Sequence, residues 1–179
     1  MRFFLAIFGS EIGIPFFYSY IYTLQKFLVM NLKKEYLSVI LVDDIEDEHI
    51  LFRKALAAVP RLDVDVKCFF SAQELESFLE ETEVVPHVVF LDMHMPEKNG
   101  LECLKDIRSL ARVRELVVAM YSVSSDNNII QNCLANGANI YITKPRKFKE
   151  LTERLHDVIK SCMRYHTMSM DFDTFIKRF

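Results

Sequence analysis

The chain has few cysteines, and none of them stands in a pair. Its 179 residues include four cysteines, at positions 68, 103, 133 and 162. No Cys-x-x-Cys spacing is present, so the sequence offers neither a redox dithiol nor a zinc site of the usual spacing. Each cysteine falls within an apolar stretch, which predicts buried, reduced thiols in a cytoplasmic protein. A chain of this length can bury a full hydrophobic core without disulfides or a structural metal.

An excess of positive charge is also missing. The chain carries 22 Lys and Arg against 25 Asp and Glu, and both signs are mixed along it, for a formal net charge of -3. Non-specific nucleic-acid binding is driven by counterion release at a basic surface. We therefore expect no direct nucleic-acid partner.

Long uncharged runs are absent as well. The longest in the aromatic-rich start of the chain extends from Ile12 to Gln25 and contains Pro15. It is shorter than the roughly 20 residues that a membrane-spanning helix requires. A spanning helix is therefore not the first expectation for this segment.

Residues 1–36 nevertheless differ from the rest of the chain. Arg2 precedes an apolar run, as in a secretory signal, but Glu11 lies inside that run and no small-residue cleavage pattern follows. Three interpretations stay open: an apolar extension outside the working domain, with a natural start at Met30; an amphipathic segment that contacts a membrane; and a true signal or span. None of them decides the function.

A regular alternation of patterns begins at Leu37. Residues 37–42, LSVILV, form a short apolar run that is typical of a strand buried on both faces, and residues 46–59 then place apolar side chains at helical spacing. The alternation repeats four more times. The predicted strands are 37–42, 64–70, 87–92, 115–122 and 139–143, and the predicted helices are 46–59, 71–81, 100–111, 126–137 and 147–162.

Helix-capping residues support these boundaries. Ser71 is followed three residues later by Glu74, Asp126 or Ser125 can begin the fourth helix, and Gly137 can end it. Five apolar strands that alternate with amphipathic helices predict an α/β domain with a doubly wound parallel sheet and helices on both faces. We expect this domain to cover residues 37–162, followed by a tail at 163–179.

Polar residues follow several of the predicted strands. They are Asp43, Asp44, Asp92, Ser122 and Lys144. One aspartate at a strand end is often only a helix cap, but in a doubly wound sheet all five positions meet in the crevice at the carboxyl ends of the strands. Clustered carboxylates raise one another's pKa unless a cation neutralises them, which predicts Mg²⁺. The lysine can hold an anion, so the combination predicts phosphoryl chemistry.

These residues resemble the receiver domains of two-component response regulators. The resemblance covers about Leu37 to Cys162. The matching motifs, in order, are Asp43-Asp44, Asp92 with Met95-Pro96 and Gly100, Ser122, Gly137-Ala138, Tyr141 and Lys144-Pro145. The resemblance implies a CheY-like, flavodoxin-like sheet with strand order 2-1-3-4-5, and a stand-alone receiver because no output domain follows in these residues.

The resemblance also implies a role for each residue of the site. Asp92 is expected to accept a phosphoryl group from a histidine kinase or a histidine phosphotransfer protein. Asp44 is expected to bind Mg²⁺ directly and Asp43 largely through water, while Asp92 and the backbone carbonyl of His94 complete the ligands. Lys144 is expected to pair with the phosphoryl oxygens.

A switch is implied beside that site. Ser122 is expected to move toward the phosphoryl group, and Tyr141 to turn from an exposed to a buried rotamer. In this family the Lys144–Pro145 bond is usually cis, which predicts a slow isomerisation in folding. The surface of the fourth strand, fourth helix and fifth strand would then change for a downstream protein target.

Several residues depart from the family pattern. Val123 follows Ser122 where a smaller residue is common, which predicts narrowed access for water and a longer-lived phosphorylated state. His94 is expected to be an exposed modulator, and not to bind metal through its ring. Arg146 and Lys147 are expected to form a solvated basic edge, with a contact for an acidic partner as the alternative.

The remaining histidines and the tail carry weaker signals. His49, His87, His156 and His166 have no mutual metal spacing and are expected to be ordinary surface or capping residues. The tail at 163–179 is too short for a DNA-binding domain, so we expect it to pack back on the domain or to mediate a homodimer. The pair Leu51-Phe52 in the first helix is similar to single-domain regulators that serve phytochrome-type kinases.

Two other classes of protein remain as alternatives. An aspartate-nucleophile phosphatase of similar α/β fold would resemble its family in a second acid two residues after the nucleophile, and this chain has His94 there. A scaffold that works without phosphorylation would be expected to have lost one of the acidic residues or the lysine. The sequence keeps all of them, which favours a signalling phosphoacceptor that is not an enzyme on other substrates.

Overall fold

The computed structural model describes residues 35–59, 62–168 and 177–178. Its strands are β1 (Glu35–Val42), β2 (Leu62–Phe69), β3 (Val88–Asp92), β4 (Val117–Ser122), β5 (Ile140–Thr143) and β6 (Lys177–Arg178). Its helices are α2 (Glu46–Ala57), α3 (Ala72–Glu81), α4 (Gly100–Ser109), α5 (Asn127–Ala135) and α6 (Phe148–Met168), with a 3-10 turn at Ala111–Val113. The three interpretations of the chain's start concern residues 1–36, of which residues 1–34 lie outside this description and the last two belong to β1.

The sheet confirms the predicted topology. Its strand order is β2-β1-β3-β4-β5-β6, and the pairs β1/β3, β3/β4, β4/β5 and β5/β6 are all parallel. The first five strands therefore follow the order 2-1-3-4-5. The sixth strand was not predicted, because Lys177 and Arg178 carry no apolar pattern. They pair with Ile140 and Tyr141 of β5, while residues 169–176 of the tail lie outside the described residues.

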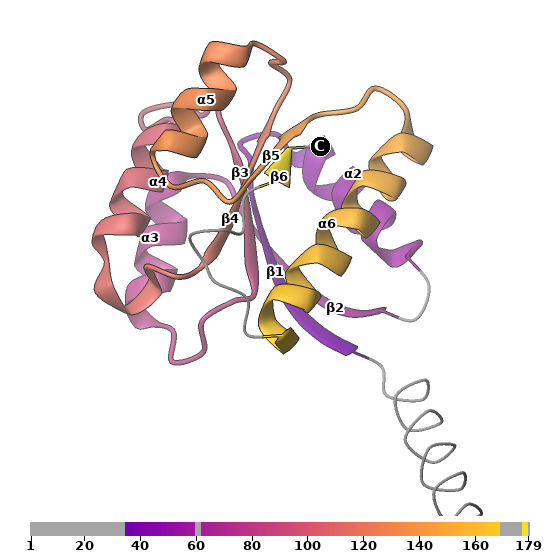
Figure 1. The fold of residues 1–179 in the computed structure, drawn as a ribbon, viewed down its shortest axis with the longest axis horizontal. Helices are drawn as coiled ribbons and strands as arrows, with labels where there is room; N and C mark the ends of the chain where they lie inside the picture. Colours follow the sequence, from indigo (N-terminus) through magenta and orange to yellow (C-terminus); the bar gives the residue numbers. More distant parts are fainter. Residues whose placement is uncertain (1–34, 60–61, 169–176, 179) are drawn as a thin grey trace, which may run out of the picture. The chain divides into compact units, whose positions relative to one another are not determined.

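Two layers of helices cover the sheet. Helices α2 and α6 lie on one face, and α3, α4 and α5 lie on the other (Figure 1). Every residue of β3 and of β4 is buried, as expected for strands with helices on both faces. Phe52 of α2 packs against Phe90 and Tyr121 of the sheet. Met120 and Tyr141 belong to the apolar cluster on the opposite face. No helix of the described residues has both the length and the apolar character needed to cross a bilayer.

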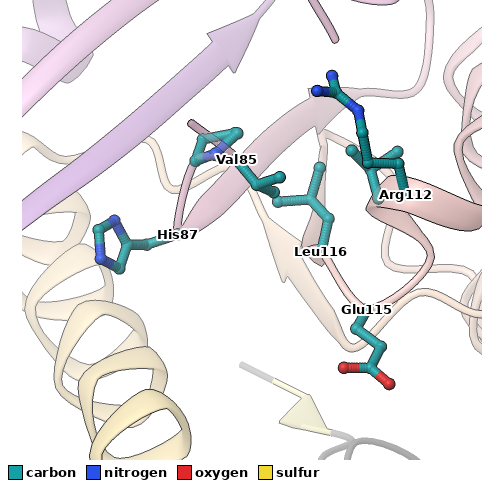
Figure 2. A pocket seen from close by; sticks show the side chains of 7 residues that line it. Val85, His87, Arg112, Glu115 and Leu116 are labelled. Atoms are coloured by element: carbon teal, nitrogen blue, oxygen red, sulfur yellow. The ribbon is translucent and has the colours of Figure 1, made fainter. Parts of the chain in front are cut away.

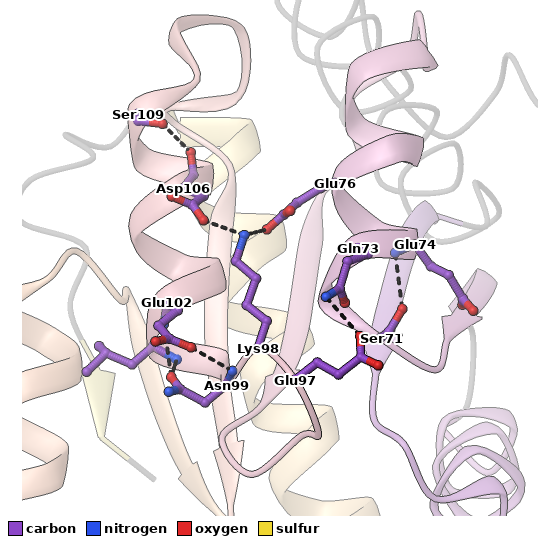
Figure 3. A network of polar contacts seen from close by, with 11 residues as sticks. Ser71, Gln73, Glu74, Glu76, Glu97, Lys98, Asn99, Glu102, Asp106 and Ser109 are labelled. Atoms are coloured by element: carbon purple, nitrogen blue, oxygen red, sulfur yellow. Dashed lines mark hydrogen bonds and ion pairs between the residues drawn. The ribbon is translucent and has the colours of Figure 1, made fainter.

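The helix boundaries follow the capping residues. The Ser71 side chain accepts a hydrogen bond at the start of α3, and the Asp126 side chain does so at the start of α5, as predicted. Helix α4 begins with a full capping box (Figure 3). The Asn99 side chain accepts the backbone N–H of Glu102, and the Glu102 side chain accepts the backbone N–H of Asn99. Gly137 follows α5 with a φ of 94°, a conformation that residues with a side chain rarely adopt.

Lys98 joins two helices beside the turn that follows β3. Its ammonium pairs with Glu76 of α3 at 2.5 Å and with Asp106 of α4 (Figure 3). Burial would lower the pKa of Lys98, but hydrogen bonds to the two carboxylates outweigh it and raise the pKa above its ordinary value. The turn between Asp92 and α4 is therefore anchored on a side chain that stays charged.

Gly100 is required at the start of α4 because the backbone passes it so closely. A Cβ at this position would lie 2.1 Å from the carbonyl oxygen of Asp92, well inside van der Waals contact. Gly100→Ala is therefore expected to lower the free energy of unfolding by about 1–3 kcal/mol, as for other overpacked sites. Chemical denaturation measures this. Helix propensity alone predicts the opposite sign, so an unchanged or raised stability would contradict the close packing.

Candidate functional site

Three strand ends bring two carboxylates and one ammonium together. Asp43 follows β1, Asp92 ends β3, and Lys144 follows β5. The Lys144 Nζ lies 2.6 Å from Oδ2 of Asp43 and 2.7 Å from Oδ1 of Asp92. Asp43 is fully buried and Asp92 is only 5% exposed. The predicted convergence of these three residues is thus present.

The second oxygen of each aspartate is held by the loop that follows it. Oδ1 of Asp43 accepts the backbone N–H of Ile45 at 3.0 Å, and Oδ2 of Asp92 accepts the backbone N–H of His94 at 2.6 Å. Each carboxylate is therefore fixed in orientation by its own turn as well as by the lysine. The His94 side chain is exposed, as predicted for this residue.

Lys144 is held in a largely buried position. Its side chain is 9% exposed, its backbone N–H donates to the Ser122 carbonyl at 2.7 Å, and its Nζ lies 4.9 Å from the centre of the Tyr121 ring. Burial would lower the pKa of Lys144, but hydrogen bonds to Asp43 and Asp92 outweigh burial and raise the pKa. The site therefore contains a permanent cation at neutral pH.

The bond that follows this lysine differs from the expectation. The described residues contain no cis peptide bond, so Lys144–Pro145 is trans and the prediction of a cis bond is wrong for this structure. The trans form is the more stable one for an X–Pro bond, and here it still allows the ammonium to reach Asp43 and Asp92.

Ser122 and Tyr141 lie on the neighbouring strands β4 and β5. Both side chains are buried, and the Tyr141 hydroxyl donates to the Ser124 carbonyl at 3.0 Å. The Ser122 Oγ accepts the backbone N–H of Ser124 at 3.3 Å. Burial raises the pKa of Tyr141, with the bonds to the two serines opposing it. The tyrosine thus occupies the buried one of its two predicted positions.

The predicted metal ligands lie at the carboxyl edge of the sheet, but their side chains do not surround a common point. Asp44 is exposed beside the buried Asp43. Within the described part of the chain, no three acidic, imidazole or thiol side chains form a group that could enclose a metal ion. Mg²⁺ does not need one, since it keeps several waters and is usually bound through one or two carboxylates. The carboxylate oxygens of these residues therefore fit that ion.

Two residues near the site were not found from the sequence. His49 was expected to be an ordinary surface or capping residue, and the surface position is wrong: it is 5% exposed, its ring packs on Phe70, and its Nε2 lies 2.7 Å from the Asp43 carbonyl oxygen. Glu48, its neighbour, is half-buried with its charge near Lys144. The acidic run that opens α2 is the sequence signal that points to these two positions.

A separate cavity of about 370 Å³ lies near the opposite ends of the strands. It is lined by Val85, Pro86, His87, Arg112, Val113, Glu115 and Leu116 (Figure 2). The Arg112 guanidinium donates to the carbonyls of Leu79 and Thr82. None of the predicted site residues lines this cavity, so the strand-end cluster remains the candidate functional site.

The chain matches known sequences over most of its length. A family model described as the response regulator receiver domain matches residues 39–156. The chain is 33% identical over 115 residues to a protein-glutamate methylesterase/protein-glutamine glutaminase of Treponema denticola, covering 62% of this chain and 29% of that protein. It is 28% identical over 120 residues to the nitrate/nitrite response regulator NarL of Escherichia coli K12, covering 66% of this chain and 53% of that protein. The chain therefore spans only part of these relatives.

Solved structures share the fold. The response regulator domain of Thermotoga maritima CheB has a TM-score of 0.59 at 26% identity, covering 76% of this chain and 99% of that one. The phosphorylated cyanobacterial phytochrome response regulator RcpA has a TM-score of 0.64 at 21% identity, covering 76% and 98%. The Mn²⁺-bound form of response regulator Rcp1 has a TM-score of 0.62 at 18% identity, covering 75% and 97%. The structures share the fold, and the family match shows that the chain belongs to the response regulator receiver domain family.

Proposed function

We propose that this protein is a phosphoacceptor that takes a phosphoryl group onto Asp92 and uses it to switch protein–protein interactions. The observation that supports this most is the Lys144 ammonium, which lies within 2.7 Å of both Asp43 and Asp92 at the carboxyl edge of the sheet. A buried lysine in that position is suited to hold an anion that arrives at Asp92. Receiver domains of this family are in general signalling phosphoacceptors.

The proposed step is a phosphoryl transfer between two proteins. An oxygen of the Asp92 carboxylate forms a bond to phosphorus, and the bond from phosphorus to the imidazole nitrogen of a phosphohistidine breaks. The imidazole leaves with the electron pair of that bond, and Asp92 becomes an acyl phosphate. Water later replaces the carboxylate at phosphorus and releases inorganic phosphate. Positioning and charge neutralisation carry most of such a reaction, so little acid–base work falls to the protein.

The residues of this chain would divide the work of the site. Asp44, Asp43, Asp92 and the backbone carbonyl of His94 would hold Mg²⁺, which supplies charge neutralisation at the phosphoryl oxygens when it is bound. The Ile45 and His94 N–H groups keep the two buried aspartates oriented. Lys144 would exchange part of its contact with the carboxylates for a contact with the phosphoryl group.

The signal would leave the site through Ser122 and Tyr141. The Ser122 hydroxyl would hydrogen-bond the phosphoryl group, and the loop after β4 would follow it because Ser124 is bonded to both side chains. Two arrangements of a packed loop, biased by one local charge, are a common form of molecular switch. The surface formed by β4, α5 and β5 would therefore differ between the two states.

The proposed partners are proteins. A sensor histidine kinase or a histidine phosphotransfer protein would donate the phosphoryl group, and a downstream protein would bind the switched surface. We propose a cytoplasmic regulator without direct nucleic-acid contact, in which the tail supports either packing on the domain or a homodimer. The activities named for these relatives are not proposed for this chain, because it spans only 29% and 53% of those proteins.

One experiment separates this function from the two alternatives. The full chain is incubated with acetyl phosphate and Mg²⁺, or with beryllofluoride and Mg²⁺, and its mass and ¹⁹F signals are followed. A phosphoacceptor gives one adduct per chain and no sustained hydrolysis of p-nitrophenyl phosphate. A phosphatase would show sustained turnover, and a phosphorylation-independent scaffold would give no adduct.

Val123 is expected to affect how long the phosphoryl group persists. It directly follows Ser122 and its side chain is 71% exposed, so it can shield the approach to Asp92 without supporting the core. Val123→Ala is expected to shorten the half-life of the phosphorylated protein roughly threefold to tenfold, because water reaches the acyl phosphate more easily, an effect of order 1 kcal/mol on the barrier. Loss of the adduct after removal of donor measures this. An equal or longer half-life would contradict a shielding role.

A further inference from the structure

Glu48 lies on the side of α2 that faces the site. It precedes Phe52 by four residues, so these two side chains share one side of the helix. Phe52 is fully buried, and its ring packs against Tyr121 of β4 with ring centres 6.0 Å apart. Lys144 lies over the same tyrosine ring. Glu48 is therefore one helical turn closer than Phe52 to the edge where Asp43, Asp92 and Lys144 meet.

Most charges around Glu48 are those of the phosphoacceptor site. Burial raises the pKa of Glu48, Lys144 opposes this, and Asp43, Asp92 and the neighbouring Asp47 raise it further. The pKa of the Tyr121 hydroxyl is raised by burial and then by Glu48, Asp43 and Asp92 together. Both results place the Glu48 carboxylate within electrostatic reach of the same cluster.

Glu48 has no direct partner that would explain its position. Its side chain is half-buried, and among the described residues its carboxylate takes part in no hydrogen bond or ion pair. Lys144 is already in contact with both Asp43 and Asp92. A half-buried carboxylate beside other carboxylates is unfavourable in the folded protein unless a further cation compensates it.

We propose that Glu48 is a fourth carboxylate of the phosphoacceptor site and that its charge raises the affinity of the site for Mg²⁺ without binding the ion directly. This inference rests on the proposed function, since it concerns the same site. With Asp43, Asp44 and Asp92, Glu48 brings four carboxylates against the single ammonium of Lys144, so the metal-free edge carries an excess of negative charge. A divalent cation relieves that excess before an anionic phosphodonor arrives.

The chain offers a matched control for this residue. Glu46 lies in the same first turn of α2 but is exposed, so Glu46→Gln removes the same charge from the same helix end. Mg²⁺ is titrated calorimetrically into the unphosphorylated full chain. Glu48→Gln is expected to weaken Mg²⁺ binding roughly threefold to tenfold, as for one charge a few ångströms from a divalent ion in a wet site, and Glu46→Gln less than about twofold. Glu48→Asp, which keeps the charge, is expected to retain most of the affinity.

A second measurement excludes a merely structural role. In metal-free buffer at neutral pH, Glu48→Gln is expected to unfold at a higher temperature than the wild type, because the unfavourable charge is gone, although it binds Mg²⁺ more weakly. A lower unfolding temperature, an affinity equal to the wild type, or equal losses in Glu46→Gln and Glu48→Gln would each overturn the inference. The variant Asp44→Asn tests the proposed metal site itself. If the wild type binds no Mg²⁺, or if Asp44→Asn binds Mg²⁺ as tightly as the wild type, the proposed metal site is wrong and the inference about Glu48 is wrong with it.

Discussion

Asp92→Asn is expected to abolish the phosphorylated form of this protein entirely. The amide that replaces the carboxylate is not a nucleophile toward phosphorus. Among the described residues, Asp92 is the aspartate that ends the buried strand β3 and contacts Lys144. Incubation with acetyl phosphate and Mg²⁺ should therefore leave the mass of the variant unchanged. The loss should exceed 100-fold relative to the wild type, the scale expected when a covalent nucleophile is removed.

The variant should lose its function without losing its fold. Asparagine has nearly the same shape as aspartate, and Lys144 keeps its 2.6 Å contact with Asp43. We expect a thermal unfolding transition close to that of the wild type. Asp65→Asn, on the exposed side of β2, removes the same charge away from the site and should be phosphorylated normally. Phosphorylation of Asp92→Asn at the wild-type level would assign the acceptor to another residue.

Lys144→Met is expected to have the largest effect on stability. Without the ammonium, the fully buried Asp43 and the nearly buried Asp92 share no counterion. Removal of one partner from a buried ion pair typically costs about 3–5 kcal/mol. The raised pKa of Lys144 means that its contribution is present throughout neutral pH and is lost only as pH rises above its ordinary value of 10.5. Urea denaturation at pH 7 should therefore show the full loss.

Mg²⁺ binding provides a second test of the stability loss expected for Lys144→Met. Mg²⁺ should stabilise Lys144→Met more than it stabilises the wild type, because the ion replaces the missing positive charge and binds only the folded state. Lys147→Met, at an exposed position three residues later, should change the free energy of unfolding by less than about 0.5 kcal/mol. If the two lysine variants are equally stable, the contacts of Lys144 with the aspartates contribute nothing to the fold.

The strands and helices followed from patterns that act locally. The apolar residues of the runs before Asp43, Asp92 and Ser122 are buried in strands, and Ser71 and Asp126 cap the helices that they were expected to begin. Such patterns are visible in sequence because burial on both sides of a sheet and the unpaired N–H groups of a helix start each demand particular residue types.

The remaining features depend on contacts that no local pattern records. The burial of His49 arises from Phe70, more than twenty positions away in the chain, and from the Asp43 carbonyl. The charge environment of Glu48 is set by residues of three different strand ends. The pairing of Lys177–Arg178 with β5 likewise depends on residues far away in the chain.

Chemical trapping of the phosphorylated residue in the wild-type chain tests the central claim most directly. The protein is incubated with acetyl phosphate and Mg²⁺, the acyl phosphate is reduced with borohydride, and the converted aspartate is located by peptide mass spectrometry. We predict conversion of Asp92 alone, dependent on Mg²⁺ and absent after hydroxylamine treatment. Conversion of Asp43 or Asp44 in its place, or no conversion at any residue, would contradict it.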